Sequence, residues 1–241
     1  MFVSSVLSLS LLIQLPTSTQ ITLLMMVVTE QPSKCPIRSL TASRNLSHIQ
    51  RMGLLDALIE WLGLGRRDVS VLVVGLDNSG KTSLLNYLRP RESQNSYIVP
   101  TVGFNVERFV CQGLSFTAFD MSGQSRYRTL WGNYYRTTNG IIFVIDSSDR
   151  ARIMIAREEL QQLLSHPDIL SRNIPILFFA NKMDIRDALS DVGVSSALAL
   201  DSITNKSWHI CSSNALNGDG VADGIEWLSS AIKASLDQGR T

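Results

Sequence analysis

The sequence predicts a three-layer α/β domain on a six-stranded, mostly parallel sheet with one antiparallel edge strand, preceded by a short amphipathic helix. Two observations lead to this prediction. Beyond residue 68, apolar strand-like segments alternate with segments of helical periodicity. In addition, IIFVID at 141–146 and IPILFFAN at 174–181 are nearly continuous apolar runs, as expected for strands that are buried on both faces. Ligands of such sheets bind beyond the carboxyl ends of the strands, so site residues are expected there.

Length, composition and charge narrow the class of protein. The 241 residues suffice for one sizeable domain with an appendage, and an apolar share of 44% excludes wholesale disorder. The net charge is +1, and residues 1–51 hold four basic residues against Glu30, so the rest of the chain is slightly acidic. This balance disfavours a nucleic-acid-binding protein, which would show a basic excess. Cys35, Cys111 and Cys211 lie too far apart for a disulfide framework or a zinc cluster, which favours a reducing compartment.

Residues 1–51 differ from the rest of the chain, because no charged residue occurs before Glu30. A secretory signal is disfavoured, since no basic segment precedes the apolar run. A membrane span needs about 20 mostly apolar residues and would have to include Pro16 together with several Ser and Thr residues. We favour a third interpretation, a non-structural leader that comes from a gene-model extension upstream of a true start at Met52.

An amphipathic helix is expected at 53–64. Apolar residues recur there at positions i, i+3, i+4 and i+7 from Leu55, and the basic pair Arg66 and Arg67 follows. Such a helix suits the boundary of an anionic bilayer, and it could equally pack on its own domain. Residues 52–68 are therefore expected to be a helix and linker, and residues 69–241 the main domain.

The main domain is expected to contain six strands and four longer helices. The strands are predicted at 69–75, 104–110, 114–120, 141–146, 174–180 and 208–211, and the helices at 81–88, 150–164, 192–200 and 221–236. Only residues 111–113 separate the second and third strands, and so short a connection is typical of an antiparallel hairpin. This hairpin supplies the antiparallel edge of the sheet.

The segment GLDNSGKT at 75–82 follows the first strand and opens the first helix, which is the setting of a phosphate-binding P-loop. Backbone N–H groups of residues 78–83 can surround a phosphate at the helix N-terminus. Lys81 is expected to reach the β- and γ-phosphates, and the Thr82 hydroxyl to ligate Mg²⁺. The nucleotide-contacting residues expected here are Asp77, Asn78, Ser79, Gly80, Lys81, Thr82 and Ser83.

The segment NKMD at 181–184 decides between adenine and guanine. Asp184 can accept hydrogen bonds from N1–H and the exocyclic amine of guanine, and adenine offers no such pair of donors. Asn181 and Lys182 belong to the same site, with the Lys182 stem along the purine face. Cys211, Ser212 and Ser213 are expected to form a short loop after the sixth strand, and a backbone N–H of this loop to donate to the guanine O6. The expected ligand is thus GTP or GDP.

The segment DMSGQ at 120–124 follows the third strand and completes the expected site. Asp120 is placed to hold Mg²⁺ through water, Gly123 N–H to sense the γ-phosphate, and Gln124 to orient an attacking water. Thr101 follows Pro100 and is expected to become a further Mg²⁺ ligand only when the γ-phosphate is present. The chemistry is hydrolysis of GTP to GDP and phosphate, with Lys81 stabilising charge. It is expected to be slow without an activating protein, because no arginine in the chain is identifiable as a catalytic finger.

These motifs, together with PTVGFNVE at 100–107 and an ending QGRT without a prenylation cysteine, resemble the Arf and Arf-like branch of the Ras-superfamily small GTPases. The resemblance covers residues 52–241. Within the branch, FDMSGQSRYRTLW at 119–131, SHPDI at 165–169 and RNIPILFFANKMDIRDA at 172–188 look most like the Bardet-Biedl-linked Arf-like type, which recruits the BBSome coat to ciliary membranes.

The resemblance implies a small GTPase G domain at 69–241 that cycles between GDP and GTP states. In the GTP state the helix at 53–64 would insert into membrane lipid, and an effector surface would form around Phe104, Phe119 and Tyr134, with Trp131 nearby. The partners implied are a BBSome-like coat complex, an exchange factor and an activating protein. The protein is expected to be a monomer in the cytoplasm, peripheral on membranes, at the ciliary membrane or base.

Departures from the family pattern are Phe119 in place of a Trp, and Ser122 and Ser212 in place of a Gly and an Ala, so effector choice and turnover are not carried over. Two other functions remain open. One is a membrane-anchored GTP-binding interaction subunit with incidental hydrolysis, in which residues 1–51 form a real anchor. The other is a P-loop nucleotide or metabolite kinase, disfavoured because NKMD selects guanine and no Arg-rich lid is visible.

Overall fold

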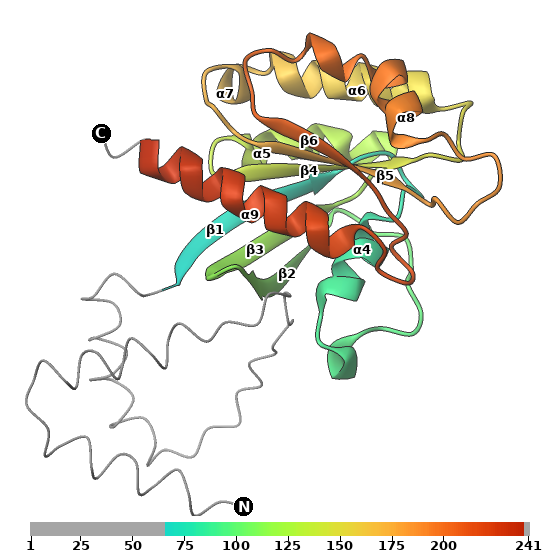
Figure 1. The fold of residues 1–241 in the computed structure, drawn as a ribbon, viewed down its shortest axis with the longest axis horizontal. Helices are drawn as coiled ribbons and strands as arrows, with labels where there is room; N and C mark the ends of the chain where they lie inside the picture. The colour runs from blue at the N-terminus through green and yellow to red at the C-terminus, as the bar shows by residue number, and fades with distance from the viewer. Residues whose placement is uncertain (1–65, 239–241) are drawn as a thin grey trace, which may run out of the picture. The chain divides into compact units, whose positions relative to one another are not determined.

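The computed structural model describes residues 66–238 of the protein (Figure 1). The expectations for the leader at 1–51 and the amphipathic helix at 53–64 lie outside the described residues. Among the helices between residues 66 and 238, none combines the length and the apolar character that a membrane crossing requires. The described range contains the predicted α/β domain apart from its last three residues, 239–241.

The centre of the domain is one six-stranded sheet with the strand order β2-β3-β1-β4-β5-β6. Its strands are β1 (Arg67–Val74), β2 (Phe104–Cys111), β3 (Leu114–Met121), β4 (Gly140–Asp146), β5 (Ile176–Asn181) and β6 (Trp208–Ser212). All neighbours pair in parallel except β2, which runs antiparallel to β3 at the edge. The predicted topology is therefore confirmed.

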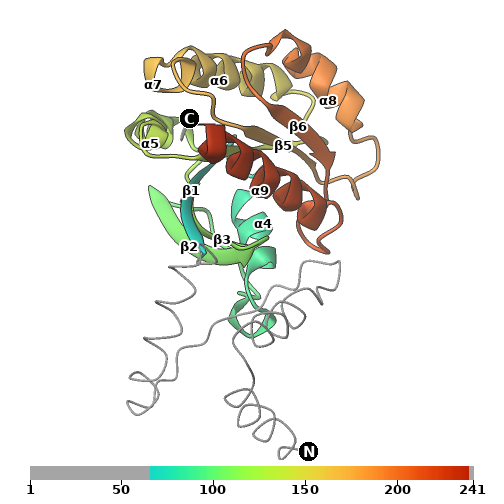
Figure 2. The same ribbon diagram turned by 60° about the vertical axis from the view of Figure 1, so that its left-hand side comes forward.

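Helices cover both faces of this sheet, which gives the predicted three layers (Figure 2). The longer helices are α4 (Lys81–Leu88), α6 (Ile153–Ser165), α8 (Asp191–Leu198) and α9 (Val221–Gln238). Alternation along β4 explains the layers. Ile141, Phe143 and Ile145 pack on the side of α6 and α8, whereas Ile142 and Val144 pack on the side of α4 and α9. The continuous apolar run in β4 is thus buried on both faces, as predicted.

Five short elements were not predicted from the sequence. They are η1 (Arg91–Ser93), η2 (Ser125–Trp131), α5 (Gly132–Tyr135), α7 (Pro167–Leu170) and η3 (Leu200–Ser202). Each is too short to show a hydrophobic period, so pattern reasoning has little to detect. The segment formed by η2 and α5 matters for the site, because it follows directly on Gln124.

Most predicted elements differ from the observed ones by one to three residues at an end; the helix expected at 150–164, for example, spans 153–165. Two elements differ for clear local reasons. The helix expected at 192–200 spans 191–198, because the Ser190 side chain caps its N-terminus and Ala199 leaves the helical region with φ 54°. The strand expected to begin at Ile174 begins at Ile176, since Pro175 has no N–H to donate to a ladder.

The hairpin between β2 and β3 fixes how the two phosphate-side loops approach each other. Gln112 and Gly113 have φ 50° and φ 73°, as a two-residue type I′ turn requires. Cys111 pairs with Leu114, so the connection is two residues long rather than the three expected. At the far end of the hairpin, Ser122 N–H donates to the carbonyl of Gly103 at 2.9 Å. The loop that contains Thr101 is thereby tied to the one that contains Gly123.

Candidate functional site

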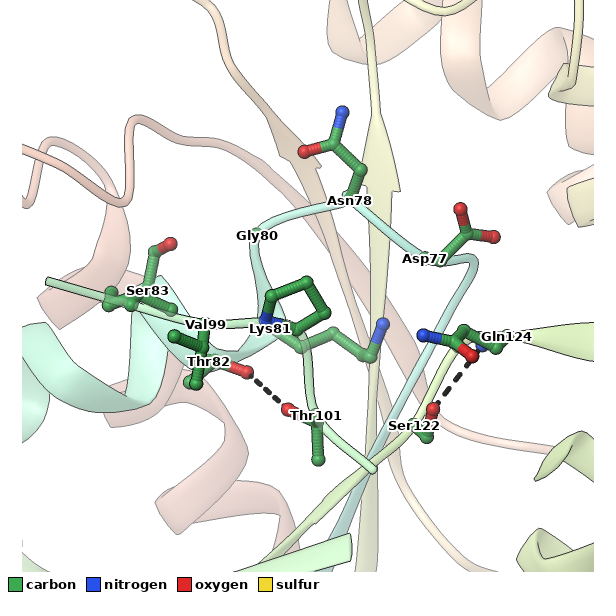
Figure 3. Close-up of a pocket in the computed structure, with 13 residues that line it drawn as sticks. Asp77, Asn78, Gly80, Lys81, Thr82, Ser83, Val99, Thr101, Ser122 and Gln124 are labelled. Carbon is green, nitrogen blue, oxygen red and sulfur yellow. Dashed lines mark hydrogen bonds between the residues drawn. The ribbon is translucent and has the colours of Figure 1, made fainter. Parts of the chain in front are cut away.

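A cavity of about 350 Å³ lies beyond the carboxyl ends of β1 and β3 (Figure 3). This volume falls in the range of about 300–1,000 Å³ that is usual for ligand pockets. Three loops line it, and the lining residues are Asp77, Asn78, Gly80, Lys81, Thr82, Ser83, Ile98, Val99, Pro100, Thr101, Ser122, Gly123 and Gln124. The structure therefore brings together the three phosphate-side motifs predicted from the sequence.

The loop between β1 and α4 needs its glycines. Gly80 has φ 96°, and a Cβ at this position would overlap the Nδ2 of Asn181. Asn181 is buried, and its Nδ2 donates to the carbonyl of Ser79 at 2.8 Å. A residue at the end of β5 thus holds the phosphate loop directly, and only a glycine at position 80 allows that approach.

Lys81 is buried along the wall of the cavity. Its Nζ donates to the carbonyls of Gly75 at 3.0 Å and Leu76 at 2.7 Å. Burial lowers the pKa of Lys81 to about 8, although nearby Asp120 and Asp77 favour the charged form. A dianionic phosphate beside Lys81 would raise its pKa again, because the negative charge stabilises the charged ammonium form.

We expect the affinity for GDP to fall as the pH rises above 8. Lys81 of the free protein is charged below its pKa of about 8, whereas above that pH each binding event must take up a proton. The association constant then falls by up to about tenfold per pH unit. Calorimetry at pH 8.5 in buffers of different ionisation enthalpy measures this uptake directly. A Lys81→Arg variant, whose guanidinium stays charged, should show none, and absence of uptake in the unsubstituted protein would contradict the assignment.

The three residues predicted to hold a metal ion lie next to one another. Thr82 Oγ1 donates to Asp120 Oδ2 at 2.7 Å, and Thr101 Oγ1 lies 3.0 Å from Thr82 Oγ1 and 3.4 Å from Asp120 Oδ2. Asp120 is 1% exposed, and burial raises its pKa. Within residues 66–238, no donor reaches its second oxygen, Oδ1.

This donor set fits a hard divalent cation. The described residues contain no group of three or more His, Cys, Asp or Glu side chains that could hold a metal ion. The site offers instead the Asp120 carboxylate, which has one unsatisfied buried oxygen, and the hydroxyls of Thr82 and Thr101. These are oxygen donors of the kind that Mg²⁺ prefers. Mg²⁺ keeps several water ligands and takes further ligands from substrate phosphates, so a small number of protein donors is sufficient.

Gly123 lies against the backbone of the phosphate loop. A Cβ on Gly123 would overlap the peptide group between Leu76 and Asp77. The next residue, Gln124, is half-buried at the cavity wall, and its Oε1 accepts a hydrogen bond from Arg126 Nε at 3.0 Å. Thr101 and Gly123 thus both approach the phosphate loop, which is the closed arrangement expected of two loops that engage one phosphate.

The comparisons with known proteins agree with this geometry. A sequence profile of the ADP-ribosylation factor family matches residues 55–232. The chain belongs to this family. It is an Arf-like small GTPase, an enzyme that hydrolyses GTP, and a guanine nucleotide is its ligand.

Relatives of this Arf-like GTPase are similar to it over nearly their whole length. ADP-ribosylation factor-like protein 6 of Danio rerio is 57% identical over 183 residues, 76% of this chain and 98% of the relative. The protein of the same name from Caenorhabditis elegans is 45% identical over 190 residues, 79% of this chain and 100% of the relative. The solved structure of the Arl6 BBS3 small GTPase from Trypanosoma brucei, with a bound GppNp nucleotide analogue, is 38% identical with a TM-score of 0.65. It covers 70% of this chain and 99% of that one.

On the predicted base side, Lys182 and Asp184 differ in their surroundings. Lys182 has φ 66°, and its Nζ lies 2.7 Å from Asp146 Oδ2. Burial alone would raise the pKa of Asp146, but hydrogen bonds from Lys182 and Ser148 lower it below its usual range. Asp184 is exposed. The physical reason is that Asp184 lies in a surface turn beyond the end of β5, where only a bound base could cover it.

The loop predicted at 211–213 was wrong for its first two residues, Cys211 and Ser212. Both belong to β6, paired with Phe179 and Ala180 of β5, and burial raises the pKa of the Cys211 thiol to about 11. The loop begins one residue later, at Ser213. Ser213 N–H donates to the carbonyl of Ala180 at 2.8 Å, and Ser213 Oγ donates to Asn181 Oδ1 at 3.3 Å.

Sequence reasoning missed Ala215 and Arg152. Ala215 N–H donates to Asn181 Oδ1 at 3.0 Å, which puts the loop after β6 beside the phosphate loop. The Asn- and Gly-rich segment NALNGDG at 214–220 was the available signal for this loop. Arg152 Nη1 lies 3.2 Å from Asp77 Oδ2, and no local pattern indicates a contact across 75 residues.

Proposed function

We propose that this Arf-like GTPase binds Mg²⁺ and GTP in the described cavity and acts as a switch whose two loops close on the γ-phosphate. The observation that supports this most strongly is the convergence of oxygen atoms from Thr82, Thr101 and Asp120 beside the buried Lys81. These residues come from three separate segments, the start of α4, the loop before β2 and the end of β3, and a common ligand explains why they meet.

The phosphate chain is bound by the loop between β1 and α4. The nucleotide-contacting residues are Asp77, Asn78, Ser79, Gly80, Lys81, Thr82 and Ser83, through backbone N–H groups and the side chains of Lys81 and Thr82. Thr82 and Thr101 hold Mg²⁺, and Asp120 does so through water. When bound, the metal neutralises charge on the β- and γ-phosphate oxygens. Gly123 N–H contacts the γ-phosphate, so this residue reports whether GTP or GDP is bound.

Hydrolysis in this proposal depends mainly on Gln124 and Lys81. Gln124 lines the cavity and orients the attacking water, while Lys81 stabilises negative charge on the phosphates. The Oε1 of Gln124 is engaged by Arg126 in this structure, so Gln124 must leave that contact to receive the water. Turnover is therefore slow until an activating protein arranges Gln124 and adds cationic stabilisation.

The guanine base is bound at the ends of β5 and β6. Asp184 accepts hydrogen bonds from N1–H and the exocyclic amine, and Lys182 lies along the ring, held by Asp146. Asn181 does not read the base itself but joins the phosphate loop to the loop after β6. The backbone donor for the guanine O6, expected within 211–213, is supplied by the loop at 213–215, because Cys211 and Ser212 belong to β6.

The wider cellular role extends the same proposal. Residues 1–51 are a leader, residues 52–68 a helix and linker whose segment 53–64 binds membrane lipid in the GTP state, and residues 69–241 the G domain. The monomeric protein is cytoplasmic, peripheral on membranes at the ciliary membrane or base, and served by an exchange factor and an activating protein. The names of the relatives, ADP-ribosylation factor-like protein 6 and Arl6 BBS3, support an effector coat complex of the BBSome type.

The proposed effector surface is an aromatic cluster next to the site. The ring centroid of Tyr134 lies 5.3 Å from that of Phe104 and 4.8 Å from that of Phe119. Phe104 is 42% exposed at the start of β2, directly after the loop that contains Thr101. In this proposal, closure of the loops on the γ-phosphate sets the position of Phe104, and binding of a partner here depends on the bound nucleotide.

We expect Gln124→Leu to hold the protein in its GTP state, and the effector complex to be retained only by that state. The leucine side chain cannot orient a water, so hydrolysis stimulated by an activating protein should fall by at least about 100-fold. Pull-down of the BBSome by Gln124→Leu loaded with GTP, compared with the same variant loaded with GDP, measures whether effector binding depends on the bound nucleotide. Adding Phe104→Ala should abolish capture without changing nucleotide affinity. Equal capture in both nucleotide states would contradict the proposed switch.

A further inference from the structure

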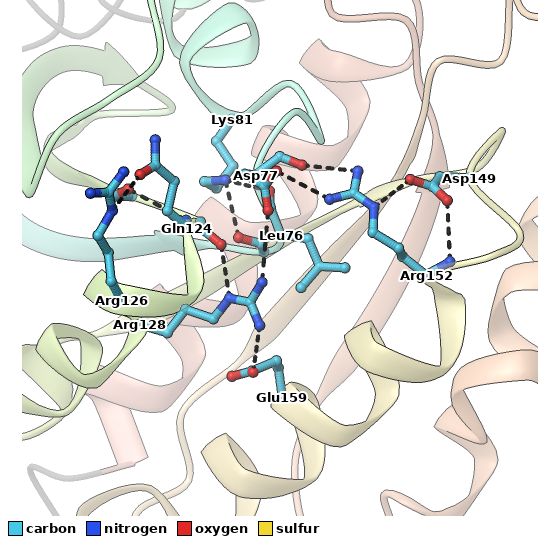
Figure 4. A network of polar contacts seen from close by, with 12 residues as sticks. Leu76, Asp77, Lys81, Gln124, Arg126, Arg128, Asp149, Arg152 and Glu159 are labelled. Atoms are coloured by element: carbon cyan, nitrogen blue, oxygen red, sulfur yellow. Dashed lines mark hydrogen bonds and ion pairs between the residues drawn. The ribbon is translucent and has the colours of Figure 1, made fainter.

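Arg128 connects three separate parts of the domain (Figure 4). It belongs to η2, and its side chain is only 14% exposed. Its Nε donates to the carbonyl of Gly123 at 2.8 Å and its Nη1 to Glu159 Oε1 at 2.7 Å, while its Nη2 lies 3.7 Å from Asp77 Oδ1. One guanidinium thus contacts the loop after β3, helix α6 and the phosphate loop.

The contact with Gly123 determines where Gln124 lies. The Gly123 carbonyl and the Gln124 N–H belong to one planar peptide group, so holding that oxygen fixes the orientation of the plane. The other side of Gly123 is confined by the peptide group between Leu76 and Asp77. Gly123 is therefore held between the phosphate loop and Arg128, and Gln124 leaves that turn in one direction.

The anchor of Arg128 is rigid. Glu159 lies in α6, which packs into the core through Ala156, Leu160 and Leu163, and its side chain is 17% exposed. Hydrogen bonds between charged groups that are largely shielded from water are stronger than ordinary surface ion pairs. Arg128 therefore ties the loop after β3 to a fixed part of the domain.

Asp77 is also held from its other side. Arg152 lies 3.2 Å from Asp77 Oδ2, and Arg152 Nε donates to Asp149 Oδ2 at 2.6 Å. The carboxylate of Asp77 thus stands between two arginines in the part of the phosphate loop that Gly123 contacts. Neither arginine is among the residues that line the cavity in the described part of the chain, so neither is placed to touch a phosphate.

We propose that Arg128 is a positioning residue that fastens the Gly123–Gln124 turn onto the phosphate loop when the γ-phosphate is bound. It stabilises the GTP state selectively, because GDP has no γ-phosphate for Gly123 to contact. This inference rests on the proposed function, in which the cavity takes a guanine nucleotide. The planar fork of arginine serves all three partners at once, which a lysine ammonium does not reproduce.

The test is the rate at which fluorescent GDP and fluorescent GppNHp dissociate into excess unlabelled nucleotide. Arg128→Ala should speed release of GppNHp about tenfold, the effect of losing one hydrogen bond to a charged group, and release of GDP less than about twofold. Arg128→Lys should lie between. The control is Arg136→Ala, which removes the same charge from an exposed position at the end of α5. It should change neither rate.

The outcomes separate this inference from the proposed function. Equal acceleration of both nucleotides would show a general structural role and overturn the inference, as would unchanged rates. Failure of the unsubstituted protein to bind either nucleotide would instead contradict the proposed function. If Arg128→Ala does not fold, Glu159→Gln removes the charged anchor on α6. It should raise the ratio of the GppNHp release rate to the GDP release rate, to a smaller extent. An unchanged ratio in Glu159→Gln would also overturn the inference.

Discussion

Gly123→Ala is expected to abolish the response to the γ-phosphate while leaving GDP bound. The backbone of Gly123 has an ordinary φ, so alanine brings no conformational strain there. Its Cβ would, however, overlap backbone atoms of Leu76 and Asp77, and these cannot rotate away as the end of a flexible side chain could. The loop must therefore move off the phosphate loop, and the Gly123 N–H moves with it. We expect the affinity for GppNHp to fall on the order of 100-fold, the usual cost of displacing groups in a close-fitting site.

Titration with both nucleotides, each in the presence of Mg²⁺, measures this effect. The affinity for GDP should stay within about threefold, because the contacts of the phosphate loop are unchanged. Gly132→Ala is the matched control, since it makes the same change where the nearest atom, His166 Nε2, would be 3.8 Å away. A parallel loss of both affinities in Gly123→Ala would mean that Gly123 supports the whole pocket and does not read the γ-phosphate.

Asp184→Asn should change which base the protein accepts. The carboxylate accepts two hydrogen bonds from guanine in our proposal, and an amide can accept only one of them and presents a donor to the other. Hydrogen bonds to charged groups contribute about 1.5–3 kcal/mol each, so the affinity for GDP should fall on the order of 100-fold to 10,000-fold. Xanthosine diphosphate carries an acceptor where guanine carries its exocyclic amine, and its affinity should rise.

Competition of GDP, xanthosine diphosphate and ADP against a fluorescent nucleotide gives all three affinities in one format. Asp187→Asn is a suitable control, because Asp187 lies three residues further along the same exposed segment, and asparagine tolerates its φ of 64°. If Asp184→Asn and Asp187→Asn bind GDP equally well, Asp184 does not read the base.

The sequence was sufficient for the fold and for the phosphate-side residues because their signals are local. The P-loop pattern, the apolar runs of β4 and β5 and the short β2–β3 connection each lie within a few residues, and each determines local structure with little help from the rest of the chain. The expectation that Thr82, Thr101 and Asp120 lie together followed from their motifs, and the sheet explains it, since these segments meet at one edge of neighbouring strands.

The base side was predicted less well because its geometry depends on contacts between distant segments. Ser212 belongs to strand β6 and not to the following loop because it pairs with Ala180. That pair depends on the register of β5 with β6. The hydrogen bond from Ala215 to Asn181 crosses 34 residues and the contact from Arg152 to Asp77 crosses 75. Neither has a short-range pattern, so only the folded chain reveals them.

Asn181 shows how the two halves of the site work as one. Its amide donates to Ser79 of the phosphate loop, and its carbonyl oxygen accepts from Ser213 and Ala215 in the loop after β6. A buried amide with its hydrogen bonds satisfied on both sides fixes the relative position of these loops. In our proposal, recognition of the base and of the phosphates is coupled through Asn181, which contacts both loops.

Hydrogen exchange of the full-length protein, loaded with GDP or with GppNHp in the presence of Mg²⁺, tests most directly whether the γ-phosphate closes both loops. The proposed switch predicts slower exchange in the GppNHp form at residues 98–104 and 122–131, and equal exchange in β5 and α9, which do not contact the γ-phosphate. Matching exchange in both forms at residues 98–104 and 122–131 would contradict it.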